Sequence, residues 1–91
     1  MSSLQQYAQN DDAFSRWLVT RPDLRPQAQA DLDTMKLALW SSSVSLVCAG
    51  RDAADRVHRL ARMANFVDSA EFYYALYERY CLRLLSLTGG K

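Results

Sequence analysis

Apolar residues recur at helical spacing through the middle of the chain, over residues 26–66. The steps between them are three, four or seven residues, which keeps one face of an α-helix continuously apolar. This primary stripe consists of Ala28, Leu32, Met35, Leu39, Leu46, Ala49, Ala53, Val57, Leu60 and Ala64. A second set, Leu37, Trp40, Val44 and Val47, lies partly off that face. The stretch therefore carries more apolar side chains than one buried stripe uses, which indicates a binding partner.

Two shorter amphipathic segments flank this stretch. The first helix is predicted over residues 4–20, where Leu4, Tyr7, Phe14, Trp17 and Leu18 share a face. Pro22 and Pro26 then predict a loop over residues 21–26, because each proline pushes the preceding residue towards extended geometry. Pro26 also suits the first turn of the next helix.

The last helix is predicted over residues 69–87. Asp68 is placed as its N-cap, with Glu71 three residues later in the capping-box position. Its main stripe consists of Tyr73, Leu76, Tyr77, Tyr80, Leu84 and Leu87. Gly89 and Gly90 end it.

Gly50 is the ambiguous boundary, because glycine is favoured just past the end of a helix and Asp52 could cap a new one. The apolar stripe nevertheless stays in phase across Gly50. The pattern therefore favours one long helix, straight or bent at Gly50, within an all-α bundle or hairpin of three helices. A break at Gly50 would give a compact bundle of four.

Length and charge narrow the class of protein. A chain of 91 residues forms one domain, residues 1–91, with a small core. Eleven basic and ten acidic side chains give a formal net charge of +1, so no overall field attracts nucleic acid or a membrane surface. The first residues lack the basic start and apolar run of a signal peptide. Cys48 and Cys81 lie in apolar helical segments, which predicts free thiols in a reducing, cytoplasmic setting.

The chain offers little for catalysis or ligand binding. It has a single histidine, His58, and no paired cysteines or acidic loop for a metal. The only pair of adjacent glycines is C-terminal, so no phosphate-binding turn is predicted. We expect no cofactor, no metal and no enzymatic activity; a cysteine hydrolase using Cys48 or Cys81 is the alternative.

Two groups of side chains are candidates for an interface. Arg51, Arg56, Arg59 and Arg62 form a cationic run on the central helix, in which Asp52 with Arg56 and Asp55 with Arg59 have the i, i+4 spacing of ion pairs. Five rings lie within nine residues of the last helix: Phe72, Tyr73, Tyr74, Tyr77 and Tyr80. These rings spread too widely to enter one core stripe, so at least one, first of all Tyr74, is expected at the surface. The predicted interface residues are Trp40, Arg56, Arg59, Arg62, Tyr74 and Tyr77.

Four features follow one another along the chain. Trp17 comes first, followed by Pro22-Asp23-Leu24-Arg25, then by a long Ala- and Leu-rich segment, and then by Ala75 six residues before Cys81. This order of segments resembles a type I-E anti-CRISPR protein. That resemblance implies a small all-helical phage inhibitor that binds the Cas helicase-nuclease and blocks its recruitment.

A second resemblance competes with the first. Arg21-Pro22, His58-Arg59-Leu60 and residues 66–80 are similar to a small helical immunity protein of type VI secretion toxins, which implies a protein that covers the active site of a toxin. Both resemblances imply steric inhibition of an enzyme. The expected partners are therefore a Cas effector or a toxin, and a second copy of this chain in a homodimer; a helical adaptor or secretion chaperone is the remaining alternative.

Overall fold

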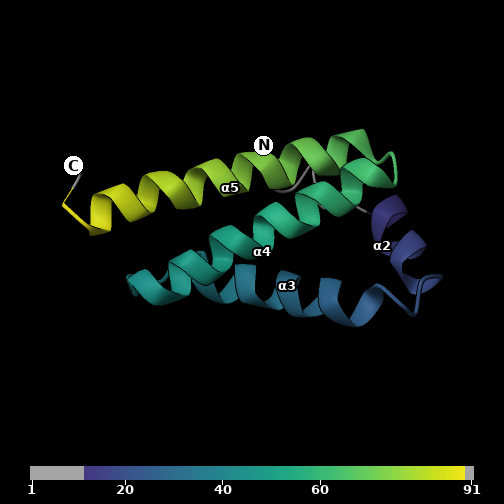
Figure 1. Cartoon of the computed structure of the whole chain (residues 1–91), viewed down its shortest axis with the longest axis horizontal. Coiled ribbons are helices and arrows are strands. Elements are labelled where there is room, and N and C mark those ends of the chain that lie inside the picture. Colours follow the sequence, from purple (N-terminus) through teal and green to yellow (C-terminus); the bar gives the residue numbers. More distant parts are fainter. Residues whose placement is uncertain (1–11, 90–91) are drawn as a thin grey trace.

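The computed structural model describes residues 12–89, and they form an all-helical domain (Figure 1). The helices are α2 (Asp12–Val19), α3 (Arg25–Ala38), α4 (Val44–Met63) and α5 (Val67–Leu87). No strand occurs in this part of the chain, so the predicted all-α class is confirmed. Residues 4–11 of the predicted first helix lie outside the described residues.

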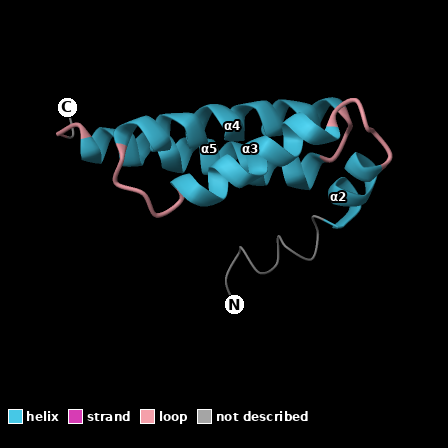
Figure 2. Cartoon of the chain, turned by 90° about the horizontal axis from the view of Figure 1, so that it is seen from below, coloured by secondary structure: helices cyan, strands magenta, loops and turns pink. Residues whose placement is uncertain are grey.

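Helix α4 is the central element of the fold. It packs against α5 on one side and against α3 on the other. These three helices run along the long axis of the molecule, while α2 lies at the end where α4 connects to α5 (Figures 1 and 2). None of the described helices is both long and apolar enough to cross a membrane.

The predicted long helix over residues 26–66 is wrong in one respect, because the chain turns at residues 39–43 rather than running on or bending at Gly50. Ser43 has extended backbone geometry and its side chain accepts a hydrogen bond from Leu46 N at 3.3 Å, which makes it the N-cap of α4. The Ser41 hydroxyl accepts from Ser43 N at 3.0 Å. Serine side chains thus replace helical hydrogen bonds with local ones here. The apolar stripe steps by seven from Leu39 to Leu46, so the turn leaves its phase intact.

Gly50 lies inside α4, where Ala38 of α3 and Tyr80 of α5 both pack against it. A Cβ atom built on Gly50 would lie 2.5 Å from Ala38 Cβ and 3.3 Å from the Tyr80 ring. The buried Tyr80 hydroxyl donates to the Met35 carbonyl, in the last turn of α3, at 2.7 Å. Burial raises the pKa of Tyr80 above its ordinary value. Gly50 therefore permits a close three-helix crossing.

The core on either side of this crossing combines small residues of α4 with larger residues of α4 and of the other helices. Ala53, Ala54 and Ala61 are completely buried. Around them lie the larger core side chains Phe14, Leu18, Met35, Val47, Val57, Tyr73, Leu76 and Tyr80. The short side chains of α4 let the axes of the neighbouring helices approach it closely. The stability of the core therefore depends on how closely its side chains fit together more than on their size.

The connection between α4 and α5 is tighter than the sequence analysis predicts. Asn65 has a left-handed backbone, φ 70°, and Phe66 N donates to Ala61 O at 2.8 Å while Asn65 N donates to Arg62 O at 3.0 Å. This is the Schellman arrangement of a helix C-terminus. Helix α5 then begins at Val67 with Phe66 as its N-cap and no side-chain cap. The predicted cap at Asp68 is wrong, since Asp68 lies in the first turn.

Aromatic rings attach α2 to this connection. Phe14 is completely buried, and its ring centroid lies 5.5 Å from that of Phe66 and 6.2 Å from that of Tyr73. The ring centroids of Trp17 and Phe66 lie 5.6 Å apart. The Arg21 guanidinium lies over the Trp17 ring, 5.3 Å from its centroid. Helix α2 therefore closes one end of the three-helix core.

We expect the substitution Gly50→Ala to destabilise the protein by about 1–3 kcal/mol, because the new methyl group overpacks the crossing. In an ordinary helix interior the same change stabilises by about 0.5–1 kcal/mol, so the sign is diagnostic. Urea unfolding followed by circular dichroism measures it. Ser45→Ala, at an exposed position of α4, is the control, and adding Ala38→Gly should recover part of the loss. A Gly50→Ala variant more stable than the parent would contradict the crossing.

Candidate protein-interaction surface

Arg56 is the first of the predicted interface residues, and the structure gives it a structural partner. Its guanidinium donates to the Asp31 carboxylate of α3, with Nη2 to Oδ1 at 2.8 Å and Nε to both oxygens at 3.2 Å. Asp31 is only 3% exposed and also accepts from Gln27 Nε2 at 3.1 Å. These hydrogen bonds raise the pKa of Arg56 above its ordinary value. Arg56 thus joins α4 to α3.

The remaining arginines of the run differ in their ion-pair partners. Arg59 pairs with Asp55 at 3.3 Å, as the spacing predicts. The predicted pair of Asp52 with Arg56 is wrong: Asp52 is held instead by Arg51, at 3.1 Å. Packing against α3 brings the buried Asp31 within reach of Arg56, and no spacing within one helix encodes that contact. Arg62 is exposed in the last turn of α4. Arg56 and Arg59 also keep exposed side chains, so all three cations of this face are accessible.

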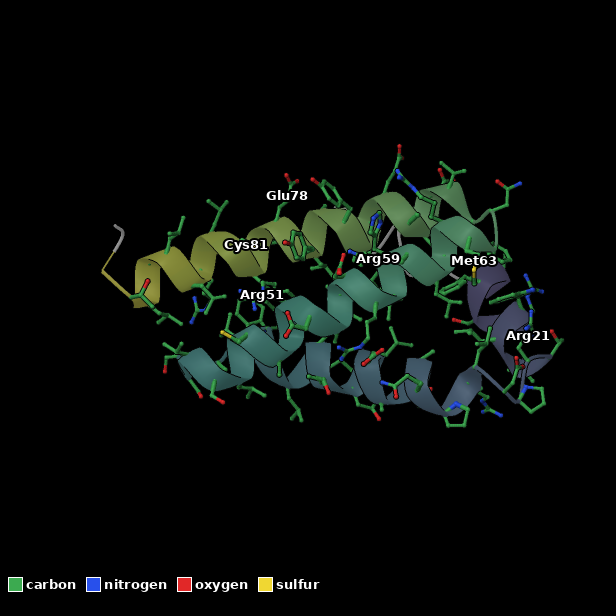
Figure 3. All side chains as sticks on the ribbon, in the orientation of Figure 1. Arg21, Arg51, Arg59, Met63, Glu78 and Cys81 are labelled. Atoms are coloured by element: carbon green, nitrogen blue, oxygen red, sulfur yellow. The ribbon has the colours of Figure 1, made fainter. Side chains whose placement is uncertain are left out.

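Tyr74 and Tyr77 lie along the seam between α4 and α5. Their rings stack with centroids 6.0 Å apart, and Tyr74 also lies 5.2 Å from the His58 ring. Tyr74 is exposed and Tyr77 half-buried, so the expectation of a surface ring at Tyr74 is confirmed. The Cys81 thiol, as a hydrogen-bond partner, raises the pKa of Tyr77. Arg51 and Cys81 lie beside each other at the same seam (Figure 3).

Trp40 lies apart from these side chains. It is 80% exposed in the turn after α3 and borders a small hollow with Arg79 and Arg83 of α5. Arg83 Nε donates to the Ser41 carbonyl at 2.9 Å, which ties α5 to this turn. At 100° per residue, Arg79 and Arg83 occupy a different side of α5 from Tyr74 and Tyr77. The six predicted residues therefore do not form one continuous surface.

One hollow in the described part of the chain was not predicted. It is an open groove of about 410 Å³ between α3 and α5, which we call the α3–α5 groove, and it continues into the hollow beside Trp40. Its walls are Ser15, Gln29, Leu32, Met35, Lys36 and Leu39 on one side and Phe72, Tyr73, Leu76 and Tyr80 on the other. The sequence held part of the signal for it: Leu32, Met35, Leu39, Tyr73, Leu76 and Tyr80 belong to the predicted apolar stripes, although the last three and Met35 are buried core residues.

The groups that a catalytic site would need are not assembled among the described residues. His58 Nδ1 lies 3.1 Å from the Ala70 carbonyl, to which it donates when it carries the proton, and its ring contacts Tyr74. Cys48 and Cys81 are half-buried free thiols, as predicted. Cys81 contacts Tyr77 rather than His58. No group of three metal-ligating side chains occurs within residues 12–89.

We expect Arg56→Ala to destabilise the fold by about 1–3 kcal/mol, because it leaves the buried Asp31 carboxylate without its main donor. Arg59→Ala is the matched control: it removes an exposed i, i+4 pair and should cost at most about 0.5 kcal/mol. Thermal and urea unfolding of both variants measure the difference. Equal losses would mean that Asp31 does not depend on Arg56.

Comparison with known proteins identifies no family for this chain. No protein-family model matches it, and no curated protein or solved structure gives a significant match. Its function is therefore argued from its surfaces.

Proposed function

We propose that this chain is a non-catalytic inhibitor that binds another protein and blocks it sterically. The observation that carries the proposal is the exposure of large apolar side chains, among them Leu37, Trp40, Leu82 and Leu85, because exposed apolar surface on a small helical domain is typical of a protein-binding site. The strongly exposed Trp40 at one end of the groove adds a side chain of the type that anchors interfaces.

The target that we propose is a Cas effector, so that the protein acts as an anti-CRISPR in a phage-infected bacterial cell. This choice rests on the resemblance carried by Trp17, residues 22–25, Ala75 and Cys81. The alternative target is a bacterial toxin, for which the chain would be the immunity protein. A helical adaptor or secretion chaperone would use the same exposed apolar side chains without inhibiting an enzyme.

The Cas target predicts that expression of the chain in a cell with an active type I-E system restores transformation by a targeted plasmid towards the level of an untargeted one. The physical reason is that a covered effector cannot be recruited to DNA. A cell that lacks the CRISPR system is the control. Unchanged interference, together with protection from a co-expressed toxin encoded beside this gene, would establish the immunity role instead.

The predicted homodimer stays a prediction, and it has a direct measurement. Helix α5 leaves Leu82 and Leu85 exposed, so a second copy has apolar surface to cover. Sedimentation velocity over a range of concentrations should show a dimer of twice the 10.4 kDa chain mass. A single species of the monomer mass at all concentrations would contradict it.

A further inference from the structure

We infer that the outer stripe of α5 docks an amphipathic helix of the partner protein that carries lysine or arginine side chains along its apolar face. The outer stripe consists of Glu71, Ala75, Glu78, Leu82 and Leu85, all of which are exposed. This inference rests on the proposed function, since it names the surface and the chemistry by which the target would be bound. Its basis is the spacing, the exposure and the charge of these five residues.

The members of the outer stripe follow one another at steps of four, three, four and three residues. This is the spacing of the contact positions of a coiled coil, which keeps all five on one side of a helix. From Glu71 to Leu85 the stripe spans about 21 Å at 1.5 Å per residue, or roughly four helical turns. A stripe of this length suits packing against one further helix.

The outer stripe lies on the side of α5 that is turned away from the bundle. The buried Tyr73, Leu76 and Tyr80 occupy the opposite side of the helix at 100° per residue. Figure 3 shows Glu78 pointing away from α4, against which α5 packs. Leu82 is 66% exposed. A partner helix therefore reaches the stripe without displacing any described part of the fold.

Glu71 and Glu78 give the stripe a negative charge that the described residues leave unbalanced. Neither carboxylate forms an ion pair in the described part of the chain, and neither does Asp68, three residues before Glu71. Arg79 follows Glu78 in sequence, but it borders the hollow beside Trp40, about 100° around the helix. Cations on the partner would therefore meet unpaired carboxylates, which favours docking and fixes its register.

The apolar part of the stripe indicates how the partner helix lies. Leu82 and Leu85 are in the last turns of α5, so apolar side chains of the partner belong there, and its cations belong over the earlier turns. Ala75 separates the two glutamates with a small side chain, which lets the partner backbone come close. Nucleic acid and anionic lipid do not suit this stripe, because their phosphates would meet carboxylates.

A second copy of this chain fits the outer stripe less well. In a two-fold contact the same stripe meets itself. If the two α5 helices ran parallel, Glu71 and Glu78 would each meet the same glutamate of the other copy. If they ran antiparallel about Glu78, the midpoint of the stripe, Glu78 would meet itself and Glu71 would lie against Leu85. Like charges and an unpaired carboxylate against an apolar side chain are both unfavourable, so the charge pattern favours a different, basic partner.

The test uses the full chain and two fluorescent helical peptides that share one leucine stripe. One peptide carries lysine and the other glutamate at two stripe positions seven residues apart, which is the separation of Glu71 and Glu78. Anisotropy titrations should show the lysine peptide binding about tenfold more tightly or better, with affinity falling as salt increases. Glu71→Lys/Glu78→Lys should reverse this preference. Asp33→Lys/Asp52→Lys, which changes net charge equally at exposed positions of α3 and α4, should leave it unaltered.

Two further variants test the halves of the stripe separately. Glu71→Gln/Glu78→Gln should remove the preference for lysine without reversing it, because it removes charge and keeps the shape of the side chains. Leu82→Gln/Leu85→Gln should weaken the binding of both peptides, because it removes apolar surface from the contact. All four positions are exposed, so circular dichroism should show each variant folded, with a melting temperature close to that of the parent chain.

Equal binding of both peptides by the parent chain would overturn the inference, as would a reversed preference in Asp33→Lys/Asp52→Lys. Absence of binding of either peptide would overturn it too. If that absence came with a concentration-dependent dimer that Leu82→Gln/Leu85→Gln abolishes, the outer stripe would be assigned to a second copy of the chain.

The inhibition assay separates this inference from the proposed function. If Glu71→Lys/Glu78→Lys inhibits the enzyme as fully as the parent chain does, the outer stripe is not the docking site although the function stands. If the parent chain inhibits nothing, the proposed function fails even where the lysine peptide binds.

Discussion

The contact at Gly50 is the constraint on which the rest of the structure depends. Because Gly50 has no side chain, the end of α3 at Ala38 and the ring of Tyr80 both reach the backbone of α4, and the hydrogen bond from Tyr80 to the Met35 carbonyl joins the outer helices directly. A short core of this kind buries little apolar surface per residue. Its stability therefore depends on close fit at the crossing more than on bulky side chains.

This crossing also explains why a groove exists. Helix α4 occupies one side of the α3 and α5 pair and supplies mainly small core residues, among them Ala53, Ala54 and Ala61. Among the larger side chains of the outer helices, Leu32, Leu39 and Phe72 pack on the core yet are only half-buried, whereas Met35, Leu76 and Tyr80 are buried. The apolar surplus read from the sequence is spread over several elements: Leu37 and Trp40 near the end of α3, Met63 at the end of α4, and Leu82 and Leu85 on α5 are exposed.

Polar contacts fix the relative placement of the helices. Asp31 is buried under α4 and is satisfied by Arg56 and Gln27, while Arg83 reaches the turn that follows α3. A buried carboxylate with one charged donor tolerates few alternative packings, because a shifted helix would leave its charge unpaired. These contacts hold α3 against α4 at one point and against α5 at another, which keeps the walls of the groove in position.

The sequence by itself determined the helical class, the loop before Pro26, the pairing of Arg59 with Asp55 and the exposure of Tyr74, because each follows from local spacing or from the residue's own backbone preference. Only the tertiary structure decided that the chain turns at residues 39–43 and passes straight through Gly50, since a seven-residue step keeps the same phase in a helix and across a turn. The same holds for Arg56, whose partner Asp31 lies 25 residues away, and for the groove, whose walls come from helices that are distant in sequence. Periodicity records which face of a helix is apolar; which other helix covers that face is set by close packing.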